Sequence, residues 1–279
     1  MDVATQIARG LLRCVHTHET LRREGDTLVN QSNTRTYPLI HGTVPKIFDE
    51  ADATKMEREY KSPNLYHRLR NRLYRDFNCR QYDHLWEDML ARSNADTLFL
   101  SVGGGPIRRA PFITNINIDA YPNVDIVCDA HELCYQDNSV DAIHCDAVLE
   151  HLHHPATAVK EMHRVLKKGG RIMSVVPFMQ SYHGYPHHYQ NYTITGHELI
   201  YRDHGFRIVA SGACQGPIVA MTTLSTRFCM EYLPRGINVV IGRSVQIIGL
   251  LLRPLDRLLE SHPRRYVLAS STFVLAEKI

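Results

Sequence analysis

Between residues 97 and 279, short apolar runs alternate with segments whose apolar positions recur at helical spacing. Each short run has the length of a buried strand. Five of the predicted strands cover residues 98–102, 124–127, 172–176, 206–210 and 266–275. Of the other two, the second strand ends at Asp119 and the fourth at Cys145 and Asp146. This alternation predicts an α/β fold with a doubly wound, mostly parallel sheet.

Two helices are predicted between the later strands. The apolar positions of the first are Ala158, Val159, Met162, Val165 and Leu166. Lys167 and Lys168 suit its negative end, and Gly169 or Gly170 suits its stop. For the second helix, Thr195 and Glu198 form a capping box, and Gly205 closes it.

Three consecutive glycines, Gly103 to Gly105, follow the first predicted strand. Without side chains, they let a ligand approach the backbone closely. Asp119 and Asp129 follow the next two strands, and the carboxyl ends of parallel strands face one crevice. The first of these carboxylates is placed to accept hydrogen bonds from two ribose hydroxyls, and the second to accept one from the exocyclic amine of a base. The pattern indicates a nucleoside cofactor.

The order of these features resembles class I S-adenosylmethionine-dependent methyltransferases. The resemblance is to the branch whose fourth strand runs into an xVLEHL helix start, here residues 146–152. It implies S-adenosylmethionine as cofactor, with the glycines around its methionine part, Asp119 on the ribose and Asp129 near adenine. The residues to which it assigns cofactor contacts are Gly103, Gly104, Gly105, Asp119, Asp129, Ala130, His131, Cys145 and Asp146. It also implies a seven-stranded Rossmann-like sheet whose final strand is an antiparallel edge strand beside the fifth.

Two positions depart from the family pattern. Ser101 stands where the family carries an acid, and Ile107 replaces the third glycine. Two alternatives therefore stay open: an enzyme of this fold that uses S-adenosylmethionine for chemistry other than methylation, and a non-catalytic binding scaffold. A nicotinamide dinucleotide site is disfavoured, because Arg108 occupies the last glycine of its GxGxxG fingerprint.

The predicted domains are an N-terminal module (residues 1–48), a helical connector that covers the cofactor (49–96) and the methyltransferase domain (97–279). The N-terminal module resembles the zinc ribbon fused to some methyltransferases, whose YPI-x-x-GIP end falls here on residues 37–45. The second cysteine pair of that ribbon falls on Asn30 and Asn33, and asparagine is a poor zinc ligand. Cys14, His16 and His18 lie too close together for a closed site. We therefore predict a degenerate ribbon without metal.

An apolar, mostly helical insertion covers residues 218–259 before the final strand. In the resembled family such an insertion commonly roofs the substrate pocket, and its apolar content suggests a lid, an oligomer surface or a membrane contact. The run 237–252 has about 16 residues, fewer than the roughly 20 that a membrane span needs, and Arg243 lies in its middle. A buried or subunit-facing helix is favoured over shallow membrane contact, and a subunit-facing helix would allow a homo-oligomer through residues 218–259.

Histidines concentrate after the fourth and fifth strands: nine of the 17 lie between His144 and His197. His183 and His187 belong to the loop that opens onto the substrate side of the crevice, and His151 lies across the same opening. An imidazole there can remove the acceptor proton, orient the substrate or serve the structure. A divalent metal held by this cluster is conceivable, but no spacing of two histidines and a carboxylate stands out, so no metal site is predicted.

Composition narrows the function classes. The formal charge of +3 with scattered basic residues does not suggest nucleic acid as a partner. Seven cysteines without a CxxC pair and a start without an apolar signal segment favour a reducing cytoplasm. The chain lacks the NPPY-type sequence that marks methylation of amino groups of adenine or glutamine, and it lacks the Pro-Cys nucleophile of cytosine carbon methylation. The expected activity is methyl transfer to an oxygen or nitrogen of a small molecule, such as a sugar or a secondary metabolite.

Overall fold

The computed structural model describes residues 1–48, 78–184 and 187–279. Most of the predicted connector therefore lies outside the described residues, including its aromatic positions Tyr66 and Tyr74. The part that is described contains the helix α3 (Arg80–Ala91), which agrees with a helical connector.

Seven strands form the central sheet in the order β7-β6-β5-β8-β9-β11-β10. Their bounds are β5 (Phe99–Val102), β6 (Ile113–Asn117), β7 (Ile126–Cys128), β8 (Val140–Asp146), β9 (Leu166–Pro177), β10 (Phe206–Gln215) and β11 (Ser271–Lys278). Strands β5 to β9 pair in parallel, whereas β11 is antiparallel to both β9 and β10. The predicted α/β fold is confirmed. The antiparallel strand does lie beside the fifth strand, but it is not at the edge, because β10 covers its other side.

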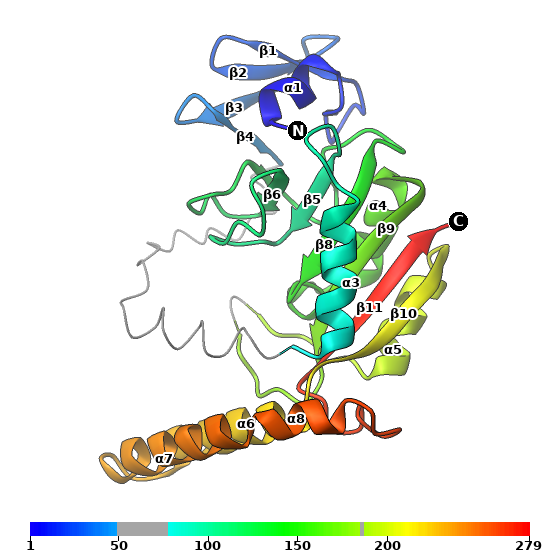
Figure 1. Ribbon diagram of the computed structural model, residues 1–279. Coiled ribbons are helices and arrows are strands. Elements are labelled where there is room, and N and C mark those ends of the chain that lie inside the picture. Colours follow the sequence, from blue (N-terminus) through cyan, green and yellow to red (C-terminus); the bar gives the residue numbers. More distant parts are fainter. Residues whose placement is uncertain (49–77, 185–186) are drawn as a thin grey trace.

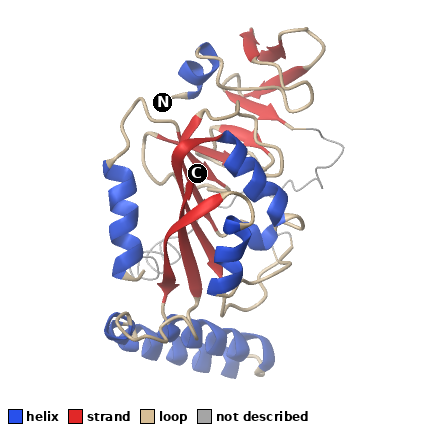
Figure 2. Cartoon of the chain, turned by 90° about the vertical axis from the view of Figure 1, so that its right-hand side faces the viewer, coloured by secondary structure: helices blue, strands red, loops and turns tan. Residues whose placement is uncertain are grey.

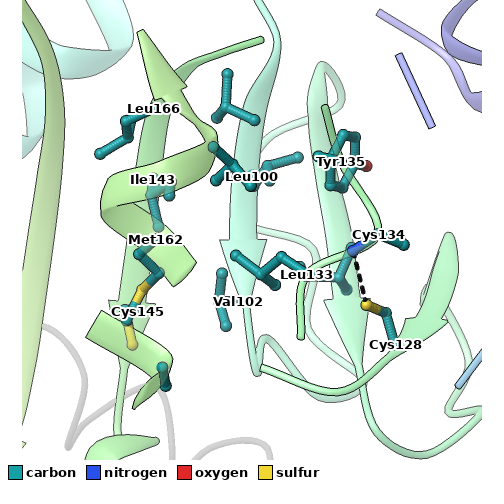
Figure 3. Packing of buried hydrophobic residues seen from close by; sticks show 14 of the residues in the cluster. Leu100, Val102, Cys128, Leu133, Cys134, Tyr135, Ile143, Cys145, Met162 and Leu166 are labelled. Atoms are coloured by element: carbon teal, nitrogen blue, oxygen red, sulfur yellow. Dashed lines mark hydrogen bonds between the residues drawn. The ribbon is translucent and has the colours of Figure 1, made fainter. Parts of the chain in front are cut away.

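Helices cover both faces of this sheet, with α3 on one face and α4 (Pro155–Val165) and α5 (Ile194–Arg202) on the other (Figure 2). Successive strand residues point to opposite faces. Phe99 accordingly packs with α3, and Leu100 packs in the cluster that contains Met162 of α4 (Figure 3). Burial on two sides explains why the central strands carry apolar side chains on both faces.

The predicted helix ends shift in the structure. Helix α4 stops at Val165, and the Lys167–Gly170 segment belongs to β9, where four residues bulge out between the pairs Val140↔Leu166 and Ala142↔Arg171. Gly169 supplies the positive φ of this bulge, at 76°. In α5 the N-cap is Thr193, whose hydroxyl accepts a hydrogen bond from the Gly196 amide, so the predicted Thr195 capping box is wrong. The final strand begins at Ser271, later than predicted.

The N-terminal residues form α1 (Val3–Ala8) and an antiparallel run of four strands. These strands are β1 (Leu21–Glu24), β2 (Thr27–Asn30), β3 (Thr36–Ile40) and β4 (Val44–Ile47). Strand β4 pairs in parallel with β7, so the N-terminal strands extend the central sheet to eleven strands (Figure 1). The module therefore shares a hydrogen-bonded edge with the strand that precedes Asp129.

Asn30, which the predicted ribbon would place at a cysteine position, is completely buried. Its Oδ1 accepts hydrogen bonds from the amides of Thr34 and Arg35, and its Nδ2 donates to Glu19 Oε2 at 2.6 Å. Cys14 is buried against the Tyr37 hydroxyl, at 3.1 Å, while His16 and His18 are exposed. An amide network thus holds this turn.

The insertion between β10 and β11 is a helical hairpin that projects from the carboxyl edge of the sheet (Figure 1). It consists of α6 (Pro217–Tyr232) and α7 (Ile237–Leu252), followed by α8 (Pro254–Leu259). Many of its large apolar side chains are exposed, among them Val240 at 67% and Leu251 at 74%. None of the described helices combines the length and apolarity needed to cross a bilayer.

His197 of α5 is completely buried beneath the sheet. Its Nε2 and Nδ1 lie 3.0 Å from the Ser174 hydroxyl and 3.1 Å from the Thr272 hydroxyl. Burial lowers the pKa of His197 from 6.5 to about 3. The folded protein therefore holds this ring neutral at pH values where the unfolded chain protonates it.

We expect this difference to make the folded state acid-sensitive. The stability that depends on the neutral ring is fully present above pH 6.5 and is lost as the pH falls toward 3. Between pH 7 and pH 5, His197 should cost about 2 kcal/mol of unfolding free energy. Urea unfolding at both pH values tests this: His197→Gln should remove that part of the pH dependence, whereas the exposed His154→Gln should keep it. If the unfolding free energy changed equally between pH 7 and pH 5 in wild type and His197→Gln, His197 would not be the source of the acid sensitivity.

Candidate active site

The glycine turn after β5 has no room for side chains. Gly103 and Gly105 adopt positive φ values of 69° and 56°. A Cβ at Gly103 would lie 2.3 Å from Val148 Cγ2, and one at Gly104 would lie 2.1 Å from Asn115 Oδ1. Close contacts with Val148 and Asn115 therefore require glycine at 103 and 104, and the positive φ favours it at 105.

Asn115 of β6 fastens this turn, and the sequence did not single it out. Its Nδ2 donates to the carbonyls of Gly105 and Asn123, at 2.8 and 2.9 Å. Its Oδ1 and the Ser101 hydroxyl are buried beneath Gly104 and have no hydrogen-bond partner in the described structure. Ser101 therefore lies directly under the turn, where the family carries an acid.

Two acids follow β6 and β7 as predicted. Asp119 is half-buried; burial raises its pKa, and its Oδ2 accepts a hydrogen bond from the Tyr121 hydroxyl at 3.3 Å. Burial also acts on Asp129, but the hydrogen bonds from the amide and ring of His131, both 2.8 Å, outweigh it and hold its pKa below the ordinary value. His131 Nε2 is buried without a partner among the described residues. Asp119 Oδ1 accepts no hydrogen bond from them either, so both groups remain available to a ligand.

The end of β8 differs from the prediction in one residue. Cys145 is 1% exposed and its side chain packs in the hydrophobic core beside Met162 (Figure 3), so it does not face the crevice. Burial raises the pKa of its thiol well above the ordinary value. Asp146, the next residue, points the other way and forms an ion pair with Arg109. The alternation of side chains along a strand separates these two neighbours.

A cavity of about 150 Å³ opens beside Asp146 at the carboxyl ends of β8 and β9. Its lining is mostly polar and comes from the described residues Asn78, Tyr82, Arg109, Asp146, Ala147, Glu150, Val175, Val176, Pro177, Gln180, His183, Cys214, Gln215 and Ser271. Burial raises the pKa of Tyr82 strongly, so its hydroxyl stays protonated. The sequence did not identify Tyr82, Arg109 or Glu150 as site residues, because they converge only in the folded sheet.

Glu150 is the least expected member of this lining. It is completely buried, and neither of its carboxylate oxygens accepts a hydrogen bond from the described residues. His151 Nε2 lies 3.8 Å and His183 Nε2 lies 3.9 Å from its Oε1. The carboxylate raises the pKa of His183 above the ordinary value. Two imidazoles and a carboxylate are thus brought together, a grouping that the spacing in the chain did not suggest.

The three histidines predicted as catalytic differ in position. His183 is half-buried and lines the cavity. His151 contacts Glu150, and its Nδ1 lies 2.5 Å from the carbonyl of His187. The His187 side chain is exposed and is not part of the cavity lining. Only His183 therefore meets the cavity directly.

Residues 111–174 match the family model of a methyltransferase domain. They span β6 to the middle of β9 and include Asp119, Asp129 and the xVLEHL segment. The chain therefore contains a methyltransferase domain of the S-adenosylmethionine-dependent class. The glycine turn, the open Asp119 oxygen and the free His131 nitrogen of this methyltransferase fit its cofactor, S-adenosylmethionine.

Several solved structures are similar to the methyltransferase. One is a putative sarcosine dimethylglycine methyltransferase from Galdieria sulphuraria, with 12% identity over 71% of this chain and 85% of the other, and a TM-score of 0.44. Another is the 1,6-didemethyltoxoflavin-N1-methyltransferase from Burkholderia thailandensis, with 16% identity over 80% and 93% and a TM-score of 0.40. The [4+2]-cyclase SpnF has 21% identity over 68% and 79%, also with a TM-score of 0.40. No curated protein matches the chain, and these distant likenesses say nothing of its acceptor.

Proposed function

We propose that the enzyme methylates an oxygen or nitrogen of a small polar molecule, such as a sugar or a secondary metabolite. The observation that carries the proposal is the cavity, which has Asp146 on the proposed cofactor side and Glu150 with His183 on the other. A bound acceptor would therefore lie between the cofactor residues and the histidine loop. The polar side chains of Asn78 and Gln180 at the cavity suit an acceptor rich in hydroxyl or amino groups.

The chemical demand on the protein is small. Bound S-adenosylmethionine supplies an activated methyl group, and the residues of the cavity align the acceptor and exclude water. A hydroxyl or ammonium acceptor must also lose a proton. The cluster of Glu150, His151 and His183 is placed to promote this loss, with His183 as the member at the cavity surface. A catalytic role for His151 stays a prediction, whereas the exposed His187 side chain lies outside the cavity lining and is expected to have none.

Transfer of a radiolabelled methyl group to a panel of sugars, phenols and amines tests this function. We expect one acceptor class to be labelled by the wild-type enzyme and none by Asp119→Ala, which removes the proposed ribose contact. Two outcomes would contradict methylation. In the first, S-adenosylmethionine binds but no acceptor is labelled; in the second, a substrate is consumed while S-adenosylmethionine remains intact. The alternative of another reaction on this fold would then lead.

We also propose that a second copy of the chain covers the exposed apolar face of α6 and α7. The two helices already pack on each other through Gly249, whose Cβ position would lie 2.2 Å from Thr222. Apolar side chains on the outer face, such as Val240 and Leu251, are left exposed among the residues that the structure describes. Two hairpins that stack across a twofold axis would bury these side chains as a four-helix bundle.

Analytical ultracentrifugation measures the mass of the assembly and so tests this proposal. The wild type should be a dimer, and the double variant Val240→Asp/Leu251→Asp should be a folded monomer, because each dimer would bury four carboxylates. The exposed Lys168 in the bulge of β9, outside the helical hairpin, provides the control, since Lys168→Asp should remain a dimer. A wild-type monomer that binds vesicles of anionic lipid would instead identify a membrane surface as the partner.

A further inference from the structure

We propose that Glu150, His151 and His183 bind a divalent cation at the wall of the cavity. The proposal deepens the proposed function, on which it rests for the position of the acceptor. It concerns a group that the spacing in the sequence did not indicate, since residue 183 lies in the loop after β9 and residues 150 and 151 lie in a 3-10 helix after β8.

The ligand atoms are already gathered. One donor atom from each of the three residues lies within 4.8 Å of the other two. A cation held about 2.1 Å from nitrogen and oxygen ligands needs them roughly 3 to 3.5 Å apart. Small rotations of side chains would close the remaining distance, because both imidazoles already face Glu150 Oε1 at 3.8 and 3.9 Å.

The buried carboxylate provides an independent reason. Glu150 has no exposed surface, and neither carboxylate oxygen receives a hydrogen bond from the residues described. Burying an ionised carboxylate costs several kcal/mol unless a positive partner or hydrogen bonds compensate. A cation at this position would satisfy it.

The outer hydrogen bonds of the two imidazoles favour metal binding. His151 Nδ1 lies 2.5 Å from the His187 carbonyl, and His183 Nδ1 lies 3.0 Å from the Ser181 carbonyl. A carbonyl only accepts, so each Nδ1 donates its proton, and in the neutral ring each Nε2 then carries a lone pair. Two lone pairs and a carboxylate thus point at one another. Backbone acceptors of this kind orient metal-binding histidines in general.

The neighbouring His188 does not belong to this set. Its Nε2 lies 2.6 Å from Asn191 Oδ1, and its Nδ1 accepts a hydrogen bond from the His183 amide at 3.3 Å. Both ring nitrogens are therefore engaged elsewhere. His188 serves as a nearby control position of the same residue type.

Two imidazoles and one carboxylate suit a transition-metal ion such as Zn²⁺ or Co²⁺ better than Mg²⁺ or Ca²⁺. Three protein ligands leave coordination positions open, and His183 and Glu150 lie at the cavity surface. An acceptor hydroxyl bound at an open position would have a lowered pKa and would release its proton to solvent before it attacks the methyl group. The ion would then replace a free imidazole as the group that promotes proton loss.

The test uses the full chain after treatment with a chelator. Calorimetric titration with Zn²⁺ should give one ion per chain, and Co²⁺ should produce visible absorption bands of a site with nitrogen and oxygen ligands. Glu150→Gln and His183→Ala should each weaken binding by at least about a hundredfold, whereas His188→Ala should bind as the wild type does. Thermal unfolding of the metal-free variants controls for loss of fold.

Absence of Zn²⁺ and Co²⁺ binding, or equal binding by wild type and His183→Ala, would overturn the site. Methyl transfer by chelator-treated enzyme that binds no ion would leave the proposed function standing with His183 as a general base. Stoichiometric metal binding without transfer to any acceptor would keep the metal site and overturn the proposed function.

Discussion

Replacing Gly103 by alanine is expected to abolish binding of S-adenosylmethionine and to destabilise the fold by about 2 kcal/mol or more. The positive φ of 69° costs an alanine about 1 kcal/mol, and the new Cβ would lie 2.3 Å from Val148 Cγ2. The overlap has to push apart the glycine turn and the segment after β8, which form the crevice together. Titration calorimetry and urea unfolding measure the two effects.

Gly25 provides the matched control. It lies in the turn between β1 and β2 with a φ of 59°, and a Cβ there would meet nothing within 4 Å. Gly25→Ala should therefore cost about 1 kcal/mol of stability through its backbone conformation alone and should leave cofactor affinity unchanged. If Gly103→Ala retains cofactor affinity and loses no more stability than Gly25→Ala, the close packing at the turn plays no part in binding.

Replacing His183 by alanine should lower kcat by about a hundredfold or more and leave the affinity for S-adenosylhomocysteine nearly unchanged. His183 lines the cavity and faces the Glu150 carboxylate, whereas the glycine turn, Asp119 and Asp129 do not belong to the lining of this cavity. The loss is expected whether the imidazole takes the proton itself or holds a metal ion that promotes the loss of the proton. Steady-state kinetics combined with calorimetry separates the effects on turnover and on cofactor binding.

His187→Ala is the control for this experiment. The His187 side chain is exposed, and its contribution to the site is a backbone carbonyl that alanine retains. Its kcat should stay within about twofold of the wild-type value. Equal losses in both variants would show that the loop acts as a whole, and equal wild-type activity in both would exclude His183 from catalysis.

The strands of the central sheet were predictable because each is a separate apolar run between polar turns. Their ends were less so. Lys167–Gly170 carry the signals of a helix stop, yet Leu166 pairs with Val140 and draws them into β9. Residues 266–270 are as apolar as the strand they precede, and they stay outside it because pairing with β9 begins only at Ser271↔Pro177. Pairing partners far away in the chain decide such limits.

The proposed cofactor site was predictable for the same local reason, since glycines and acids that directly follow strands must meet at one edge of the sheet. The acceptor cavity was not. Arg109 reaches it from the loop after β5, Tyr82 from α3 and Ser271 from β11, and none of these residues has a neighbour in sequence that signals the site. Glu150 lay within a recognised motif, but only its burial without hydrogen bonds marks it as a site residue.

Titration calorimetry with S-adenosylmethionine and S-adenosylhomocysteine, on wild type and Asp119→Ala, tests the account most directly. We predict saturable binding of one ligand per chain, weakened by a factor of about a hundred in Asp119→Ala, because two charge-assisted hydrogen bonds to the ribose are lost. Wild-type protein that binds neither ligand, or binding that Asp119→Ala leaves unchanged, would contradict the assignment of the cofactor to this crevice.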